Sequence, residues 1–504
     1  MVVLVEKNGG PQKKGINYVF MISLLLTVGL AVWSIVFNES FTVASNALSG
    51  FLTSHFSWLY LLAMMVFVFF SLYIAFSRYG NVKLGPDDSV PEYKTSSWFA
   101  MLFGAGMGVG LVFWGVSEPI SHYMAPNGME GQTLEAADFA MRTTFMHWGV
   151  HPWASYCIIG LALGYFQFRK NKPGLLSSIY SSWRGDGFAD SKFGKAIDIL
   201  AIFATVAGII TSLGLGVRQI NSGLNYLFGV PETLAVQIII MVVITALFIL
   251  VAIAGIEKGV KLISDFNLYL AFGLMIAAML VGPGIAMINN LVNGMGQYIG
   301  NFFQDSFRVS ALGDNSWTNS WRIFYWAWWI TWAPFVGSFI ARISRGRTIR
   351  QFILGVMIAP TLGSAVWFSI FGTMGINLGV NKILPQETLA QIVAAPEKGL
   401  FLVLGEYPLG MILAFLALVL LCTFFIISAN SGTFVLVMMS SNGDLNPSGN
   451  RKVLWGIVLA AMAIGVLICG LEPLPMVAIA AFPFIFIMLS ACVSIVKALK
   501  QEQP

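Results

Sequence analysis

Long apolar runs are the feature that most limits what this chain can fold into. The 504 residues are 57% hydrophobic and only 10% charged, whereas a soluble domain carries about 25% charged residues. Because a membrane-spanning helix needs roughly 20 apolar residues, the runs can be read as spans. We expect twelve spans, at residues 16–37, 57–77, 97–117, 139–168, 197–226, 234–255, 262–284, 320–342, 350–374, 408–438, 453–471 and 475–498. The sequence therefore predicts an all-α polytopic membrane protein and excludes a soluble globular one.

The charged residues predict how these spans are oriented. The net charge is +5, from 28 Lys and Arg against 23 Asp and Glu. With a cytoplasmic N-terminus, most of the basic residues fall in cytoplasmic segments, as the positive-inside rule requires. We therefore expect a multi-pass protein of the inner (plasma) membrane with both termini cytoplasmic. Its surroundings are the lipid bilayer, and no nucleic-acid partner is expected.

Interrupted spans indicate where a ligand binds. Residues 104–110 read GAGMGVG, the fourth span contains Pro152, and the eighth contains Pro334. Broken helices in two halves of a bundle turn backbone groups toward a cavity, as in transporters. The glycines also fit close helix packing through the pair Gly104 and Gly108, and both interpretations stay open on the residues alone. A phosphate-binding loop is disfavoured, because no strand precedes the glycines and no Lys follows them.

Two segments between spans have apolar residues at helical spacing beside polar ones. Residues 286–310 contain Asn, Gln and Asp between the seventh and eighth spans, and residues 383–404 lie between the ninth and tenth. This pattern is typical of helices that lie at a membrane surface. We expect the first segment to connect two halves of the protein and the second to lie outside the membrane.

Tryptophan and tyrosine gather in two spans. The fourth span contains Trp148, Trp153 and Tyr156. The eighth span contains Tyr325, Trp326, Trp328, Trp329 and Trp332. Tyr325, Trp329 and Trp332 share one helical face, so two clusters from different halves can meet as a box whose ring faces attract a quaternary ammonium. The alternative is that individual rings belong to the membrane interface or to packing.

Few ionisable residues accompany these rings. Asp198 and Asp265 stand near span starts and no acid stands at a span centre, so we expect a cationic ligand to be held mainly by π faces. His147 and His151 have the i, i+4 spacing of a zinc pair, but no Glu follows and no third ligand is evident, so no metal is expected. We expect these histidines to bond between helices near the site.

Other function classes are less well supported. An intramembrane enzyme needs a nucleophile and base, or a set of metal ligands, within its spans. A channel needs a continuous polar pore with filter rings, which the Trp-rich centre does not offer. We therefore expect a transporter and not an enzyme.

Three strings carry a resemblance to a known family: GAGMGVGLVFWGVSEPISHY, FMHWGVHPWASY and WRIFYWAWWITWAPFVGSFIARISRGRTIR. They resemble the betaine/choline/carnitine transporter (BCCT) family, and the resemblance covers nearly the whole chain. It implies two inverted five-helix repeats of the LeuT type, a homotrimer and alternating access. The segments it implies are a cytoplasmic N-terminal segment (1–15), two peripheral helices (16–96), a first repeat (97–284), an amphipathic connecting helix (285–319), a second repeat (320–498) and a short cytoplasmic tail (499–504).

The same resemblance implies a substrate site for a small trimethylammonium compound. The aromatic box corresponds to Trp148, Trp153, Tyr156 and Trp329, with Trp328 as a further candidate and Trp332 on the inner exit path. The Gly-rich turn supplies Gly106, Met107, Gly108 and Gly110 near the substrate carboxylate. Choline-type members carry an Asp in place of Gly110, whereas a zwitterion brings its own carboxylate. Betaine or carnitine is therefore favoured over choline.

Ion coupling is where the sequence departs from the sodium-driven members it resembles. Sodium, a hard cation, needs oxygen ligands. One family site combines the Gly-rich turn, here including Gly104, with a Thr-Ser pair in the tenth span, where this chain has Ile427 and Ser428. The other uses two hydroxyl residues on the fifth span, where Thr205 is kept and Ile209 takes the second position. Each site thus loses one hydroxyl.

A basic residue offers a substitute for the ion. Lys261 resembles the position at which carnitine/butyrobetaine exchangers place a basic side chain in the sodium site, where a fixed ammonium replaces the ion's charge; the alternative is a positive-inside anchor. We expect sodium-independent exchange of substrate for product. The alternative is a sodium-coupled betaine or choline symporter that uses oxygens at Gly104, Met107, Phe424 and Ser428. No cofactor is expected beyond Na⁺ in that alternative.

Overall fold

The computed structural model describes residues 17–106, 108–253 and 257–502. In these residues the regular elements are helices, with one isolated β-bridge between Lys83 and Thr348. By length and composition, nine of the described helices can cross a membrane, or up to eleven if each of two bent pairs is one span. The expectation of an all-α polytopic membrane protein is confirmed.

The α-helices follow one another along the whole described chain. Their bounds are α1 (Tyr18–Val36), α2 (Asn38–Phe76), α3 (Thr95–Gly106), α4 (Val109–Met124), α5 (Leu134–Trp148), α6 (Val150–Gly164), α7 (Ser181–Arg184), α8 (Lys192–Phe228), α9 (Leu234–Ile253), α10 (Glu257–Val281), α11 (Gly284–Gly300), α12 (Phe302–Ser306), α13 (Phe324–Ile343), α14 (Ile349–Val380), α15 (Gln386–Ala394), α16 (Gly399–Gly405), α17 (Gly410–Met439), α18 (Gly449–Cys469) and α19 (Pro473–Glu502). Single π turns, Tyr165–Arg169 and Thr318–Ile323, follow α6 and precede α13.

The peripheral helix α2 is longer than the expected span 57–77. It has 39 residues and begins at Asn38. Its first half contains many Ser, Thr and Asn residues, which lower the apolar signal, but Phe41, Ser45 and Ser49 recur at helical spacing and are buried. Small hydroxyl residues allow helices to approach closely in a membrane, so this half is helical although it is not a continuous apolar run.

Some of the predicted interruptions of spans are present in the structure and one is not. Helices α3 and α4 are bent by 63° at the Gly-rich turn, which is the interruption expected there. The fourth span also breaks, between α5 and α6 at Gly149. The expected interruption at Pro334 is wrong, because α13 runs continuously from Phe324 to Ile343. Membrane helices tolerate proline where neighbouring helices enclose the backbone, and the flanking residue Ala333 is fully buried.

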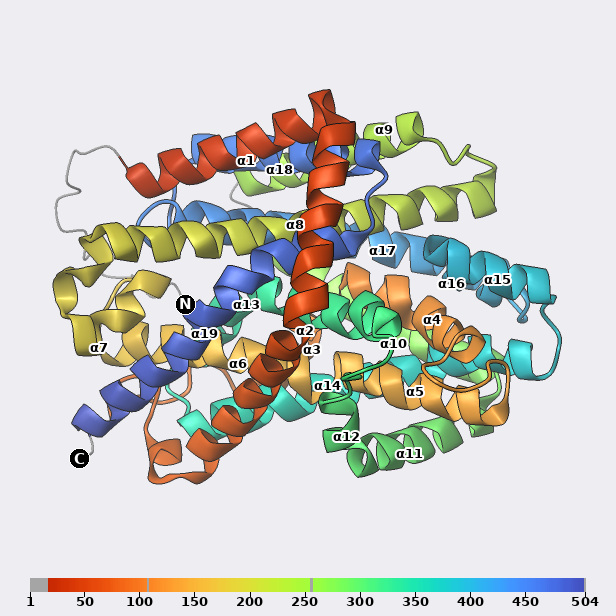
Figure 1. Ribbon diagram of the computed structural model, residues 1–504, viewed down its shortest axis with the longest axis horizontal. Coiled ribbons are helices and arrows are strands. Elements are labelled where there is room, and N and C mark those ends of the chain that lie inside the picture. Colours follow the sequence, from red (N-terminus) through yellow and green to blue (C-terminus); the bar gives the residue numbers. More distant parts are fainter. Residues whose placement is uncertain (1–16, 107, 254–256, 503–504) are drawn as a thin grey trace.

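Most long helices run roughly along the longest axis of the molecule, and α2 crosses them (Figure 1). Helix α1 lies along α18 (Figure 1), while α13 packs against α6, α8 and α19. Two helix pairs connect the halves of the chain. Helix α13 of the second half packs on α6 of the first, and α4 of the first half packs on α14 of the second. The broken helices α3–α4 and α5–α6 are therefore enclosed by both halves.

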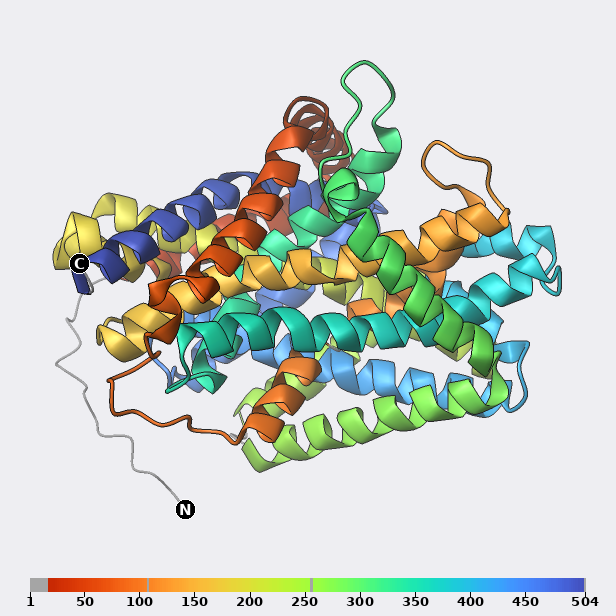
Figure 2. The ribbon, with the colours of Figure 1, turned by 90° about the horizontal axis from the view of Figure 1, so that it is seen from below.

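Both expected amphipathic segments form helices beside this bundle. The connector forms α11 and α12, and α11 packs along α5 and α14; Figure 2 shows it on the outside of the bundle. Residues 383–404 form α15 and α16, two helices bent by 115° that pack on α4. Ser117 on α4 donates a hydrogen bond to the carbonyl of Pro396 at that bend.

Candidate functional site

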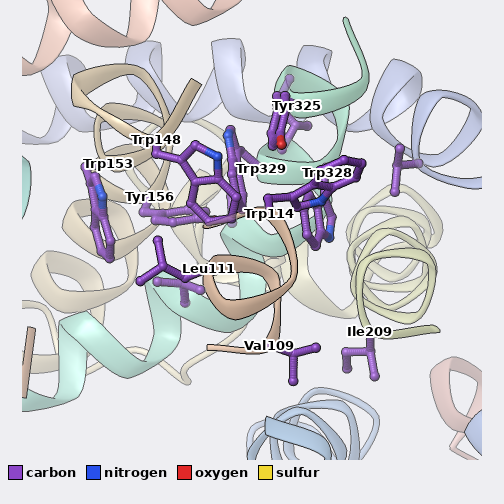
Figure 3. Packing of buried hydrophobic residues seen from close by; sticks show 14 of the residues in the cluster. Val109, Leu111, Trp114, Trp148, Trp153, Tyr156, Ile209, Tyr325, Trp328 and Trp329 are labelled. Atoms are coloured by element: carbon purple, nitrogen blue, oxygen red, sulfur yellow. The ribbon is translucent and has the colours of Figure 1, made fainter. Parts of the chain in front are cut away.

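Three elements bring the aromatic residues together. Trp148 is the last residue of α5, Trp153 and Tyr156 lie on α6 directly after the break, and Trp328 and Trp329 lie on α13. Figure 3 shows these rings gathered around the start of α4. The two Trp-rich spans thus meet, as expected for a box built from both halves.

The rings stand against one another as walls. The Trp148 and Trp329 centroids are 4.8 Å apart at 70°, those of Trp153 and Tyr156 are 5.3 Å apart at 87°, and Tyr156 lies 6.4 Å from Trp329. Trp328 stacks on Trp329 at 4.9 Å and 11°, so it supports the Trp329 ring from one side. We call Trp148, Trp153, Tyr156 and Trp329 the aromatic box.

The aromatic box is shielded from solvent. Trp148 and Trp329 are each 6% exposed, and they meet edge to face as two adjoining walls. A cation bound by a ring lies within about 6 Å of its centroid and on its face. The two adjoining walls are carried by different halves of the chain.

The Gly-rich turn contacts the box through one glycine. A Cβ at Gly110 would lie 2.7 Å from Trp328 Cη2 and 3.2 Å from Trp148 Cη2, so a side chain there displaces both rings. A Cβ at Gly104 or Gly108 would meet nothing within 4 Å. Gly110 is therefore required by close approach to the rings.

The other residues of the turn mark where the helix restarts. Gly106 ends α3, Met107 lies outside the described residues, and Gly108 precedes α4. The Gly108 carbonyl accepts bonds from the Leu111 and Val112 amides at 3.1 and 3.3 Å. The first N–H groups of α4 have no acceptor within their own helix, and Gly110 presses this turn against the box. A carboxylate is favoured at such a helix start.

The aromatic residues of α13 do not all face the box. Trp332 donates to the carbonyl of Gly208 on α8 at 3.0 Å and stacks edge-on with Phe335, while Tyr325 turns toward α4. Of the three residues on this helical face, Tyr325 still contacts the box, with its ring centroid 5.7 Å from that of Trp148 and 5.8 Å from that of Trp329, whereas Trp332 bonds to α8. A place for Trp332 on an exit path stays a prediction.

An acid that the sequence analysis missed lies behind the box. Glu118 on α4 is fully buried, and its Oε2 accepts bonds from Trp148 Nε1 at 2.7 Å and from the Tyr325 hydroxyl at 2.5 Å. The sequence predicts no acid at a span centre and acids only near span starts, and this prediction overlooks the buried carboxyl on α4. The cause is the span boundary: the predicted third span ended at residue 117, whereas α4 restarts at Val109 and continues to Met124.

Glu118 also reaches Trp329 through a histidine. His147 Nδ1 shares a hydrogen bond with Glu118 Oε1 at 2.7 Å, and the His147 carbonyl accepts the Trp329 indole N–H at 2.8 Å. Trp148 and Trp329, the two rings in contact at the box, are thus both oriented by hydrogen bonds that lead to one carboxyl. His151 bonds to Ser306 of α12 at 2.9 Å, so both histidines bond between helices as expected.

The carboxyl belongs to a group with potential metal ligands. Ligand atoms of Glu118, His122 and His147 all lie within 4.8 Å of one another. The expectation that His147 lacks further ligand candidates nearby is therefore wrong, although its partner is not His151. Glu118 Oε2 already accepts two donors, Oε1 shares a hydrogen bond with His147, and a buried Arg322 places a positive charge nearby. These features disfavour a metal cation, so we treat the group as a hydrogen-bond network.

The residues expected to couple an ion lie mainly on α8 and α17. Thr205 donates to the Ala201 carbonyl of its own helix at 2.8 Å. Ile209, one turn later, fills the contact with α17, since a Cβ at Gly432 would lie 2.6 Å from Ile209 Cδ1. Phe424 is buried on α17, where Ser428 is half-buried.

Two further hydroxyl residues, Thr211 and Ser212, follow Ile209 on α8. Helix α8 continues without a break through Thr211 and Ser212; Ser212 donates to Gly208 of its own helix at 3.2 Å, and Thr211 lines a small cavity with Val466 and Met476. Neither replaces Ile209 against α17. Lys261 lies on α10, but its side chain is outside the part of the structure described here, so its role stays a prediction.

The architecture defines a class of protein before any comparison. A polytopic helical bundle, interrupted at a Gly-rich turn and with rings from two halves converging on that turn, is the architecture of a secondary transporter. The profile described as "BCCT, betaine/carnitine/choline family transporter" matches residues 18–504. The chain belongs to this family, whose members are transporters and not enzymes, and it is a multi-pass membrane protein.

Similar proteins span almost the whole chain. The glycine betaine transporter OpuD of Bacillus subtilis (strain 168) is 47% identical over 97% of this chain and 96% of its own length. A probable glycine betaine transporter of Desulfitobacterium hafniense (strain Y51) is 42% identical over 99% and 100%. An ectoine/hydroxyectoine transporter of Virgibacillus pantothenticus is 38% identical over 97% of both chains.

Proposed function

We propose that this chain is a secondary transporter of trimethylammonium zwitterions of the glycine betaine type, working by alternating access. The observation that carries the proposal is the convergence of Trp148, Trp153, Tyr156 and Trp329 on the Gly-rich turn. Ring faces attract a quaternary ammonium, and the start of α4 favours a carboxylate. Two similar proteins carry glycine betaine transporter names, which supports the same substrate class.

A zwitterion fits this site better than choline does. Gly110 stands where the choline-type members resembled by this chain have an Asp, and the rings of Trp148 and Trp328 leave no room for a side chain there. The substrate must therefore bring its own negative charge to the turn. Glycine betaine and carnitine both do so, and glycine betaine is the one we favour because of the named relatives.

For the coupling mode we propose sodium-independent exchange of external for internal substrate. Supporting it, Ile209 fills the contact between α8 and α17 with apolar atoms, and Ile427 stands where sodium-driven members have a Thr. Lys261 would supply the fixed positive charge. Sodium-coupled symport is the alternative, with Thr205 and Ser428 as the hydroxyl residues that remain.

The proposal includes an arrangement for the whole protein. The moving units are the repeats 97–284 and 320–498, supported by the exchanged contacts α13 with α6 and α4 with α14. Segments 16–96 and 285–319 are the peripheral pair and the connector. We further propose a homotrimer in the plasma membrane. The distribution of basic residues supports a topology with both termini cytoplasmic.

Substitution of one ring tests the substrate site. Trp329→Leu removes the ring that contacts both Trp148 and Tyr156. Because a desolvated cation–π contact contributes about 2 kcal/mol, we expect the affinity of purified protein for radiolabelled glycine betaine to fall by about 30-fold or more. The matched control is Trp58→Leu, which replaces an exposed ring on α2. Equal affinity of the wild type and Trp329→Leu contradicts the proposed site.

A further inference from the structure

Glu118 is the buried group to which the proposed transport function assigns no role. It lies behind two rings of the aromatic box, on the side away from the Gly-rich turn, and contacts Trp148 and Tyr325 directly. We propose that Glu118 is a fixed negative charge that attracts the ammonium group of the substrate to the aromatic box and holds the rings in position. This inference rests on the proposed substrate class.

The hydrogen bonds around Glu118 fit an ionised carboxylate. The indole N–H of Trp148 can only donate, and the Tyr325 hydroxyl donates to the same oxygen. His147 Nδ1 approaches the other oxygen at 2.7 Å. An ionised carboxylate is an acceptor without a proton of its own, and charge-assisted bonds to it are short and strong. The charged form therefore satisfies the two donors on Oε2, and it also accepts from His147 in the tautomer that carries its proton on Nδ1.

Basic side chains close to Glu118 favour its ionised form. Arg142 pairs with the Asp305 carboxylate at 2.9 Å, whereas the buried Arg322 donates to the Asp305 backbone carbonyl. Arg322 interacts electrostatically with Glu118 and with Arg308. Because a buried positive charge without a compensating negative charge is costly, an ionised Glu118 stabilises Arg322.

The carboxylate is close enough to act on a bound cation. Glu118 Oε2 is 2.7 Å from the nitrogen at the edge of the Trp148 ring, and a cation on the face of that ring would lie about 6–8 Å from the carboxylate. With an effective dielectric constant of about 20, one charge at that separation changes affinity by roughly 30- to 100-fold.

The experiment compares two ligands that differ only in charge. Glycine betaine and 3,3-dimethylbutyrate have the same shape and the same carboxylate, but a neutral carbon replaces the ammonium nitrogen in the second. Inhibition constants of both against radiolabelled glycine betaine are measured on purified wild type, Glu118→Gln, Glu118→Asp and Glu130→Gln. Glu130 is an exposed acid that precedes α5 and serves as the control; size-exclusion chromatography checks the assembly of each variant.

The ratio of the two inhibition constants gives the outcome. We expect Glu118→Gln to reduce the preference for glycine betaine by roughly 30-fold or more, while Glu118→Asp, which keeps the charge, and Glu130→Gln retain most of it. An equal loss for both ligands in Glu118→Gln, or an unchanged ratio, overturns the inference, since loss of packing alone weakens both ligands alike. If Glu118→Gln does not assemble, loss of the preference in Glu118→Asp overturns it. If the wild type does not bind glycine betaine, the proposed function itself fails.

Discussion

Gly110 is the residue at which the Gly-rich turn meets the aromatic box. Its hydrogen atom occupies a space bounded by Trp328 and Trp148, so the position of the turn and the orientation of two rings depend on each other. A side chain at residue 110 would change the box even without adding charge. An Asp at residue 110 would therefore displace the rings as well as add a charge.

This dependence gives a prediction for Gly110→Ala. The new methyl group would lie 2.7 Å from Trp328 Cη2, and overpacking of this kind costs about 1–3 kcal/mol. We expect the affinity for glycine betaine to fall by at least about tenfold, measured by equilibrium binding. Gly273→Ala on α10 is the control, because a Cβ there meets nothing within 4 Å. Wild-type affinity in Gly110→Ala would contradict this account, because it would mean that the rings move to accommodate the methyl group without affecting binding.

At the residue scale, the sequence alone identifies the aromatic residues of the box. It does not identify the residue that orients them by hydrogen bonds. Trp148 and Trp329 stand out because tryptophan at the centre of a span is unusual. Glu118 does not, because a hydropathy boundary one residue before it placed it in a loop. Its partners come from α5 and α13, and nothing in the local sequence indicates that these three elements converge on one carboxyl.

At the scale of elements, the connector holds the break between α5 and α6. Tyr298 on α11 is buried, and its hydroxyl accepts the N–H of Val150, the first residue of α6, at 3.1 Å. A Cβ on Gly149 would lie 2.8 Å from that hydroxyl. This contact fixes the junction that carries Trp148 on one side and Trp153 on the other.

Tyr298→Phe tests the contribution of that contact. Removal of the hydroxyl leaves the half-buried Val150 N–H without its acceptor, which costs up to about 1–3 kcal/mol. We expect a lower midpoint of thermal unfolding for the purified protein together with weaker glycine betaine binding. Tyr269→Phe on the exposed face of α10 should change neither quantity. A midpoint equal to that of the wild type would mean that the junction is held by packing alone.

The sequence predicts an element correctly where one local pattern, such as accumulated glycines or amphipathic spacing, determines it. The Gly-rich turn breaks its span because glycines accumulate there, and both amphipathic connectors form helices. The break at Gly149 depends instead on contacts made by Tyr298, far away in the chain. At Pro334 the local sequence predicts a break that does not form, because neighbouring helices enclose α13 and the helix continues. The early start of α2 at Asn38 likewise follows from packing of small polar residues.

At the scale of the whole molecule, the aromatic box joins the two halves of the chain. Trp148 belongs to the first half of the chain and Trp329 to the second, and their rings are in contact. The proposed alternating access would therefore displace one half relative to the other. Apolar span length alone fixes the class of fold; the way in which the halves enclose one site follows from helix packing that hydropathy does not encode.

The central claim is tested most directly by transport in a purified system. Proteoliposomes containing the protein are loaded with unlabelled glycine betaine or left empty, and uptake of radiolabelled glycine betaine is followed with and without sodium outside. We expect uptake into loaded vesicles that is indifferent to sodium and is lost in Lys261→Ala. Uptake driven into empty vesicles by a sodium gradient would contradict exchange, and no uptake under any of these conditions would contradict the transport of betaine-type zwitterions by this protein.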